Sequence, residues 1–168
     1  MESFNALPAE RLESELLACL AAPAWGAEVA AKRPYRDRAE LFAAADAAAA
    51  GLSWDDVLLG LSAHPRIGER AAGESKEAVW SRAEQSAAAA SASSSSSSDK
   101  SALVAANRLY EDKFGHVFLI FANGRTQDEI LAAARERLGN DPLAERAVVQ
   151  GELRKIALLR LERVLDAL

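Results

Sequence analysis

Signals that begin and end α-helices recur along the whole chain, and they constrain the fold more than any other feature of the sequence. Three residue pairs have the i, i+3 spacing of a helix N-terminal cap: Asp37 with Glu40, Ser53 with Asp56, and Thr126 with Glu129. Half of the residues are hydrophobic, alanine is abundant among them, and β-branched residues are sparse. The sequence therefore predicts an all-α fold, a single compact bundle of about seven to eight helices.

Apolar spacing and punctuating residues locate the helices along the chain. We expect helices at 8–22 (which Pro23 ends), 24–32, 38–50, 54–63, 75–90, 99–114, 127–138 and 142–167. The run HVFLIFA at 116–122 is the only dense β-type stretch, and we interpret it as a short buried extended segment because a lone strand has no partner. The serine tract at 91–98 predicts a mobile surface loop. The sequence has no internal repeat and no sign of a second domain, so residues 1–168 are expected to form one domain.

The charge balance and the cysteine content narrow the classes of partner. The net charge is −5, and no basic patch is interleaved with aromatic residues, so we expect no nucleic-acid partner. The single cysteine, Cys19, lies on an apolar helical stripe and is interpreted as a core residue in a reducing compartment. No apolar stretch reaches the ~18–20 residues that cross a bilayer, and the N-terminal segment MESFNALPAE does not have the pattern of a signal peptide, so we expect no membrane contact and a cytoplasmic protein.

His64 is a candidate general acid or base, because Pro65 holds it at the end of a helix and its ordinary pKa lies near neutrality. The alternative is a histidine that is only hydrogen-bonded at a helix end. Ser81, Glu84 and Gln85 have i, i+3, i+4 spacing and so share one helical face. That face is either solvated or turned inward toward His64, and the sequence leaves both interpretations open.

Arg160 breaks the pattern of the last helix, because it falls in the middle of the apolar stripe that contains Leu153, Ala157 and Val164. A buried guanidinium needs an anionic partner. That partner is either a structural carboxylate or the carboxylate or polarised carbonyl of a substrate. No metal-ligand spacing, phosphate loop or dinucleotide fingerprint accompanies these residues, so we expect neither a metal nor an organic cofactor.

Four segments resemble the signature blocks of one family. The four blocks are AHPRIG, SRAEQS, ANRLYEDKFGHVFLIFANGR and ELRKIALLRL, and FNALP near the start also fits. The family is that of the 2-oxo-4-hydroxy-4-carboxy-5-ureidoimidazoline (OHCU) decarboxylases, which the chain resembles in the sequence and order of these blocks. The resemblance implies a compact all-α enzyme of purine catabolism that acts after uric acid oxidation and ring hydrolysis. It also implies a small ureide substrate, (S)-allantoin as product, no cofactor and a homodimer.

The resemblance assigns roles to residues that match the family's motifs. The catalytic histidine corresponds to His64, with Glu84 and Arg160 as further catalytic residues. The substrate-binding positions correspond to Pro65, Ser81 and Gln85, and to the family's substrate-lining backbone at Phe118, Leu119, Ile120, Phe121 and Ala122. Two departures stand out: Arg66 occupies a position that is acidic in many members, and alanines follow Gln85 where many members have glycine.

Two other classes of protein remain open at this point. One is a different cofactor-free acid/base enzyme that acts on ureides or cyclic amides, such as a hydrolase. The other is a non-catalytic helical interaction module, in which the face containing Glu84 is solvated and Arg160 forms a structural ion pair.

Overall fold

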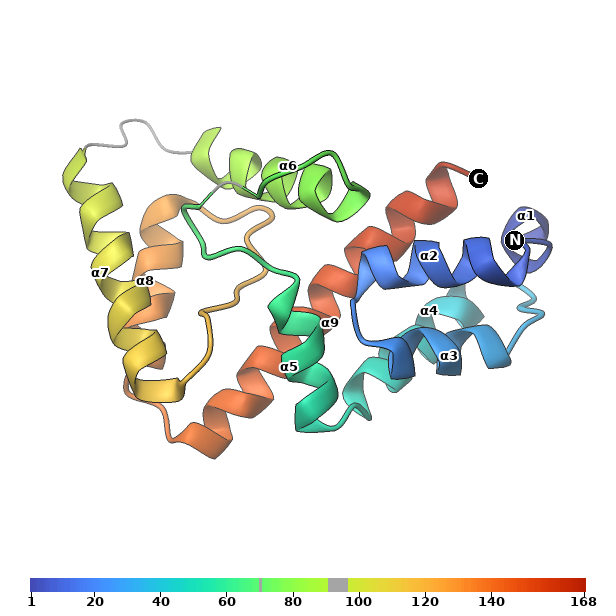
Figure 1. Ribbon diagram of the computed structural model, residues 1–168, viewed down its shortest axis with the longest axis horizontal. Helices are drawn as coiled ribbons and strands as arrows, with labels where there is room; N and C mark the ends of the chain where they lie inside the picture. Colours follow the sequence, from blue (N-terminus) through green and yellow to red (C-terminus); the bar gives the residue numbers. More distant parts are fainter. Residues whose placement is uncertain (70, 91–96) are drawn as a thin grey trace. The chain divides into compact units, whose positions relative to one another are not determined.

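The computed structural model describes residues 1–69, 71–90 and 97–168, and every regular element in these ranges is an α-helix (Figure 1). The helices are α1 (Glu2–Asn5), α2 (Ala9–Cys19), α3 (Pro23–Ala31), α4 (Arg38–Ala50), α5 (Trp54–Ser62), α6 (Lys76–Ala90), α7 (Ser97–Phe114), α8 (Gln127–Arg137) and α9 (Pro142–Asp166). The all-α prediction is confirmed. Within the described ranges, α1 is the one helix that the sequence did not predict, and it is a single turn.

All three predicted N-terminal caps form, since Asp37, Ser53 and Thr126 each accept from the backbone N–H three residues on, and one of them is a complete capping box. Thr126 and Glu129 make a complete capping box, in which the Glu129 N–H donates to Thr126 Oγ1 at 3.1 Å and the Thr126 N–H donates to Glu129 Oε2 at 2.8 Å. At α5, the Asp56 N–H donates to Ser53 Oγ at 3.2 Å. These bonds satisfy donors that have no partner inside the helix, which is why such short motifs predict helix starts well.

The remaining helix starts differ in detail from the prediction. The Glu40 N–H donates to Asp37 Oδ1 at 2.8 Å, but the Glu40 carboxylate accepts from the Arg36 N–H rather than from Asp37. Pro23 does not end a helix but begins α3, since α2 already ends at Cys19. A proline fits the first helical position because its missing N–H would have no partner there.

The chain divides into two compact units, one formed by residues 1–63 and 150–168 and the other by residues 64–149. The first is called the terminal unit and the second the central unit. In the terminal unit α2 packs against α3 and α3 against α4. Its core includes Phe4, Leu16, Trp25, Leu41 and Leu161, each fully buried. Cys19 is also fully buried, as predicted for a core residue.

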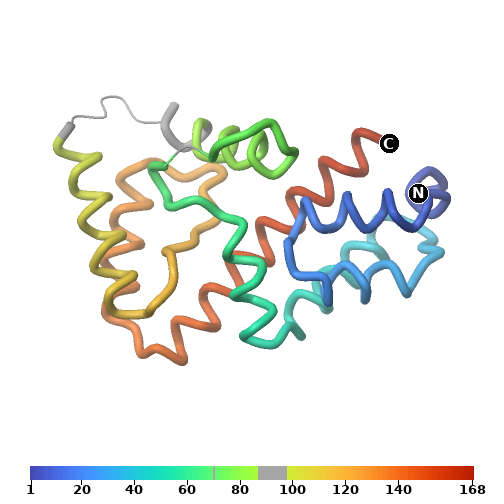
Figure 2. Tube along the Cα trace, viewed as in Figure 1, coloured from blue at the N-terminus to red at the C-terminus, as the bar shows by residue number. Residues whose placement is uncertain are grey.

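The central unit is built around α7 and α8, which lie side by side (Figures 1 and 2). Tyr110, Phe118, Ile120, Ile130 and Ala134 are buried together in its core. Residues 117–122 contribute to this core without forming a helix or a strand. The prediction that this stretch is a buried connection rather than a paired strand is therefore confirmed.

The serine tract is described only at its end. Residues 91–96 of the predicted loop lie outside the described residues, and Ser97 and Ser98 are already helical, so α7 begins two residues before the predicted Asp99. No helix in the described part of the chain has both the length and the apolar character needed to cross a membrane.

Candidate active site

His64 lies immediately after the end of α5, as the following proline predicts. The helix ends at Ser62, and Ala63 is its C-terminal cap. His64 and Pro65 are both half-buried. The imidazole is thus carried by the connection between α5 and α6 rather than by a helix.

Ser81 and Glu84 lie on a buried face of α6, at 6% and 8% exposure. The interpretation of this face as solvated is therefore wrong for these two residues. A carboxylate at this depth is costly unless it is bonded to a partner. The burial supports the alternative in which the face is turned inward.

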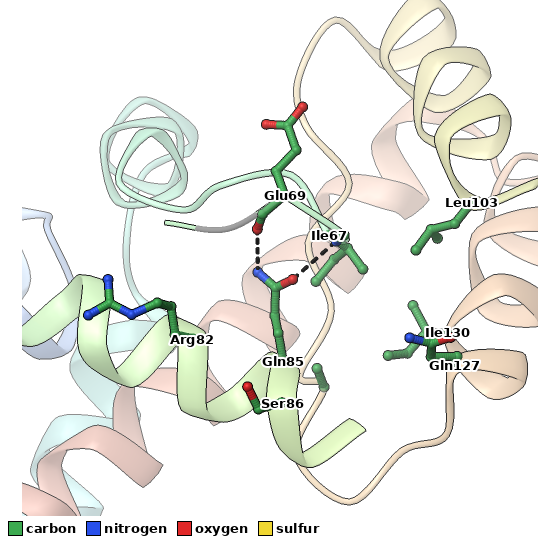
Figure 3. A pocket seen from close by; sticks show the side chains of 10 residues that line it. Ile67, Glu69, Arg82, Gln85, Ser86, Leu103, Gln127 and Ile130 are labelled. Atoms are coloured by element: carbon green, nitrogen blue, oxygen red, sulfur yellow. Dashed lines mark hydrogen bonds between the residues drawn. The ribbon is translucent and has the colours of Figure 1, made fainter. Parts of the chain in front are cut away.

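Gln85 connects α6 to the loop that follows His64. Its Oε1 accepts from the Gly68 N–H at 3.1 Å, and its Nε2 donates to the Glu69 carbonyl at 3.2 Å. Figure 3 shows the amide reaching from the helix to this loop. The amide predicted to bind substrate thus already positions protein backbone, although each of its polar atoms can make one more hydrogen bond.

The same loop is attached to α7 by two further contacts. Asn107 Nδ2 donates to the Ile67 carbonyl at 2.8 Å. Arg66 pairs with Glu111 through two bonds, Nε to Oε1 at 2.6 Å and Nη2 to Oε2 at 3.2 Å. The hydrogen bond to Glu111 raises the pKa of the Arg66 guanidinium above its ordinary value. Arg66, which departs from the family pattern, is therefore paired with a carboxylate on α7.

A cavity of about 330 Å³ lies within the central unit, beside this loop. Gln85 and Ala122, two predicted substrate-binding residues, line it. Ile67, Leu103 and Ile130 form its apolar part, with Leu103 and Ile130 across from Gln85 (Figure 3). A hollow of this size with an apolar wall and a few polar groups is typical of a small-molecule site.

The predicted substrate-binding segment 118–122 is mostly inaccessible through its side chains. Phe118, Leu119, Ile120 and Ala122 are buried, and Phe121 is half-buried. The side chains of Phe118 and Ile120 pack in the core of the central unit. Any contact that these two residues make with a ligand must therefore come from their backbone groups, which is what the family resemblance implies.

Sequence reasoning missed a buried polar network next to this segment. Glu145 is fully buried, and its Oε1 accepts from Tyr110 Oη at 2.5 Å and from Arg137 Nε at 2.7 Å. Its Oε2 accepts from Asn140 Nδ2 at 2.8 Å. Arg137 Nη1 donates to the Leu119 carbonyl at 2.7 Å. Burial and the bond to Glu145 raise the pKa of Tyr110 well above its ordinary value.

A signal for this network was present in the sequence. Ile130, Ala134 and Arg137 have i, i+4, i+7 spacing on α8, and all three are buried. Arg137 thus lies on an apolar helical face, which is the pattern that singled out Arg160.

Arg160 is buried in the apolar stripe of α9, at 3% exposure, as predicted. Its Nη1 donates to the Ala18 carbonyl at 3.4 Å. Arg160 belongs to the terminal unit, whereas His64 and Glu84 belong to the central unit. That these three side chains share one cavity stays a prediction. Across the residues that the structure describes, no group of three or more His, Cys, Asp or Glu side chains is placed to hold a metal ion.

The all-helical fold agrees with what comparison with known proteins finds. The sequence profile of the OHCU decarboxylase family matches residues 5–162. Because this match covers nearly the whole chain, the protein belongs to the OHCU decarboxylase family.

Two relatives illustrate the similarity in sequence. The chain is 32% identical over 152 residues to the uric acid degradation bifunctional protein TTL of Arabidopsis thaliana, covering 90% of this chain and 47% of that protein. It is 31% identical over 103 residues to the 2-oxo-4-hydroxy-4-carboxy-5-ureidoimidazoline decarboxylase of Amia calva, covering 61% of this chain and 58% of that protein. The alignments thus span about half the length of these relatives.

Solved structures agree with the fold. A crystal structure of an OHCU decarboxylase in the presence of (S)-allantoin matches with a TM-score of 0.76 at 30% identity, covering 92% of this chain and 99% of that one. A crystal structure of (S)-allantoin synthase matches with a TM-score of 0.68 at 21% identity, covering 96% of this chain and 52% of that one. The second similarity supports the fold alone.

Proposed function

We propose that the chain catalyses the cofactor-independent decarboxylation of OHCU to (S)-allantoin in the breakdown of uric acid. One observation carries this proposal: the chain matches, over nearly all of both molecules, an OHCU decarboxylase crystallised in the presence of (S)-allantoin. Family membership across residues 5–162 and the buried positions of Ser81 and Glu84 support it.

The substrate contains its own electron sink. Its carboxylate is attached to a carbon that bears a hydroxyl and adjoins a ring C=N. When the bond to the carboxylate breaks, carbon dioxide leaves and the electron pair moves toward the C=N nitrogen. One proton is then delivered to the adjacent carbon, so that the net change is loss of carbon dioxide and gain of a proton. The protein's task is to orient the carboxylate, stabilise the developing charge and protonate one face.

We assign His64 as the general acid or base that handles the hydroxyl proton or delivers the stereospecific one, a role typically worth ~10²–10⁴-fold in rate. Glu84 orients His64 or accepts hydrogen bonds from ureido and ring N–H groups, because an ionised carboxylate only accepts. Arg160 binds an anionic or carbonyl oxygen as charge develops.

The remaining predicted site residues bind and orient the substrate. Ser81 and Gln85 supply hydrogen bonds, and Pro65 keeps His64 out of the helix. Backbone groups of residues 118–122 read the amide edges of the ring. Since Gln85 also bonds the loop that follows His64, it links substrate binding to the position of the imidazole.

The experiment follows the chirality of the product. OHCU is generated freshly, and allantoin formation is recorded by circular dichroism, because uncatalysed decay protonates both faces and gives a racemate. We expect the wild type to form (S)-allantoin, and a folded His64→Ala variant to react at the background rate. Wild-type activity in His64→Ala would refute the assignment of His64.

A matched pair of glutamates tests the role of α6. Glu84→Gln is expected to lower the rate by a large factor, whereas Glu136→Gln, at an exposed position on α8, is expected to leave it unchanged. Ring opening without release of carbon dioxide would instead identify a hydrolase of ureides. The absence of any turnover would favour a non-catalytic helical module.

We also propose that the protein acts in the cytoplasm as a homodimer. The single cysteine, Cys19, is buried and has no second cysteine in the chain with which to form a disulfide, which is compatible with a reducing compartment. Cell fractionation tests the location, and sedimentation equilibrium tests the assembly.

A further inference from the structure

We propose that Arg137 is a positioning residue for the decarboxylation, held by Glu145, and that it fixes the backbone of residues 118–122 against the substrate. This inference rests on the proposed function, in which that backbone contacts the ring. It adds residues that the family resemblance did not assign to the site.

The segment needs such a support because it has no regular pattern of backbone hydrogen bonds, as a helix or a sheet would provide. Residues 117–122 are neither helical nor paired as a strand, yet Phe118, Leu119 and Ile120 are only 2–3% exposed. A buried backbone carbonyl without a partner is costly, and its position is poorly determined when no regular hydrogen-bond pattern constrains it. The Leu119 carbonyl obtains its partner from Arg137 Nη1, at 2.7 Å.

Arg137 holds the segment at two points rather than one. While Nη1 bonds the Leu119 carbonyl, the guanidinium carbon lies 4.6 Å from the centre of the Phe118 ring. The Phe118 ring in turn packs edge-on against Tyr110, with 5.3 Å between the ring centres. The hydrogen bond restricts the direction in which the Leu119 carbonyl points. The cation–π contact with the neighbouring Phe118 ring restricts how far the backbone lies from the guanidinium.

The guanidinium is itself held in place by Glu145. Arg137 Nε and Nη2 lie 2.7 and 2.6 Å from Glu145 Oε1, and Tyr110 Oη donates to the same oxygen. Asn140 Nδ2 donates a hydrogen bond to the other carboxylate oxygen, Oε2. Both oxygens of the buried carboxylate are thus bonded, which is the condition under which a buried ion pair defines one geometry.

The arrangement requires an arginine. Its planar fork directs Nε and Nη2 toward the carboxylate while Nη1 points to the carbonyl. A lysine in this position carries the same charge but has a single nitrogen, so it reaches one partner well and not both in this geometry. Arg137→Lys therefore separates charge from positioning.

The test compares Arg137→Lys, Arg137→Met and Tyr110→Phe with the wild type in the allantoin assay. Each variant is assayed at a temperature below its own melting temperature, so that the folded protein is measured. Arg135→Lys and Arg135→Met are the matched controls, because Arg135 is exposed on the same helix. We expect Arg137→Lys and Arg137→Met to lower kcat by about 10–100-fold with a smaller change in KM, since a small misplacement costs this much. The excess of (S)-allantoin over its mirror image should fall as well.

Tyr110→Phe removes one bond to Glu145 and keeps the aromatic packing, so it serves if Arg137→Met does not fold. We expect Tyr110→Phe to lower kcat too, but by a smaller factor than the Arg137 variants do. Hydrogen exchange of the amides in 117–122 should be faster in Arg137→Lys, while exchange in α2 and α3 stays unchanged. A purely structural role would lower the melting temperature but leave kcat and product chirality at wild-type values.

The outcomes separate this inference from the proposed function. A wild type that forms no (S)-allantoin overturns both. A wild type that is active, together with folded Arg137 variants that match it in kcat and product chirality, overturns only the inference. Equal losses in the Arg135 controls would overturn it too, because the effect would then come from charge on α8 in general.

Discussion

Residues 32–37 of the terminal unit and residues 117–122 of the central unit both run without regular secondary structure, and an arginine holds each of them. Arg33 is half-buried, and its Nη1 donates to the carbonyls of Phe4, Asn5 and Leu7 at 3.3, 3.3 and 3.0 Å. Arg137 is buried and bonds a carbonyl, but it also bonds the carboxylate of Glu145. Both arginines thus donate to backbone carbonyls, but one is half-buried and the other is buried.

The difference follows from the cost of burying charge. A partly exposed guanidinium keeps contact with water, so neutral carbonyl oxygens are sufficient partners. A guanidinium removed from water needs an opposite charge, and that charge needs its own hydrogen bonds. The central unit thus supports its irregular segment with a buried network of charged and polar groups, whereas the terminal unit uses hydrogen bonds from a partly exposed arginine to neutral carbonyls. Substitutions should therefore be costlier in the central unit.

The largest effect is expected at Glu145. Glu145→Gln keeps the shape of the side chain but leaves the buried guanidinium without a countercharge. We expect the free energy of unfolding to fall by about 3–5 kcal/mol. Urea denaturation followed by circular dichroism measures this, with the exposed Glu136→Gln as control. A loss below about 1 kcal/mol, as is usual for exposed ion pairs, would mean that the network does not support the unit.

An intermediate effect is expected at Arg33. Arg33→Met removes the donor to three carbonyls, but those carbonyls become accessible to water, so we expect a loss of about 1–3 kcal/mol. The same denaturation assay measures it, and Arg36→Met, at an exposed position three residues on, is the control. If Arg33→Met proved as costly as Glu145→Gln, depth would not be what distinguishes the two units.

The smallest effect concerns alkaline pH and involves one tyrosine in each unit. Burial raises the pKa of both Tyr35 and Tyr110 above the ordinary value. Above about pH 10 the unfolded chain loses these protons while the folded chain retains them, so stability that is fully present at neutral pH declines as pH rises. Each tyrosine contributes at most about 1.4 kcal/mol per pH unit to this decline.

The two tyrosines should differ in the size of their contribution. The Tyr110 hydroxyl donates to a carboxylate, whereas the Tyr35 hydroxyl donates to the Val29 carbonyl at 2.6 Å. We expect Tyr110→Phe to flatten the alkaline decline more than Tyr35→Phe does. Denaturation midpoints measured from pH 7 to 11 provide the comparison, and an equal flattening would contradict it.

Local features of the fold were predictable and distant ones were not. The cap at Thr126 depends on residues three positions apart, so the sequence contains all the information that it needs. The buried face of α6 was one of two open interpretations, because spacing shows which residues share a face but not what covers it. That Gln85 bonds the loop at 68–69 depends on a contact between residues 17 and 16 positions apart, which no helical pattern reveals.

The site was predictable to a similar degree. Resemblance supplied the residues, and the apolar stripe of α9 independently singled out Arg160. The same stripe argument applied to α8 would have found Arg137. It would not have found Leu119 as its partner, because an irregular segment has no period from which the direction of a carbonyl follows.

The spacing of Arg137 and Glu145 has a consequence for how the chain folds. The two residues are eight positions apart, whereas Tyr110 and Glu145 are 35 apart and Leu119 and Arg137 are 18 apart. Closing the shortest of these loops sacrifices the least chain entropy. We therefore expect the Arg137–Glu145 contact to cost the least chain entropy to close, so that residues 117–122 can add to an ion pair that has already formed.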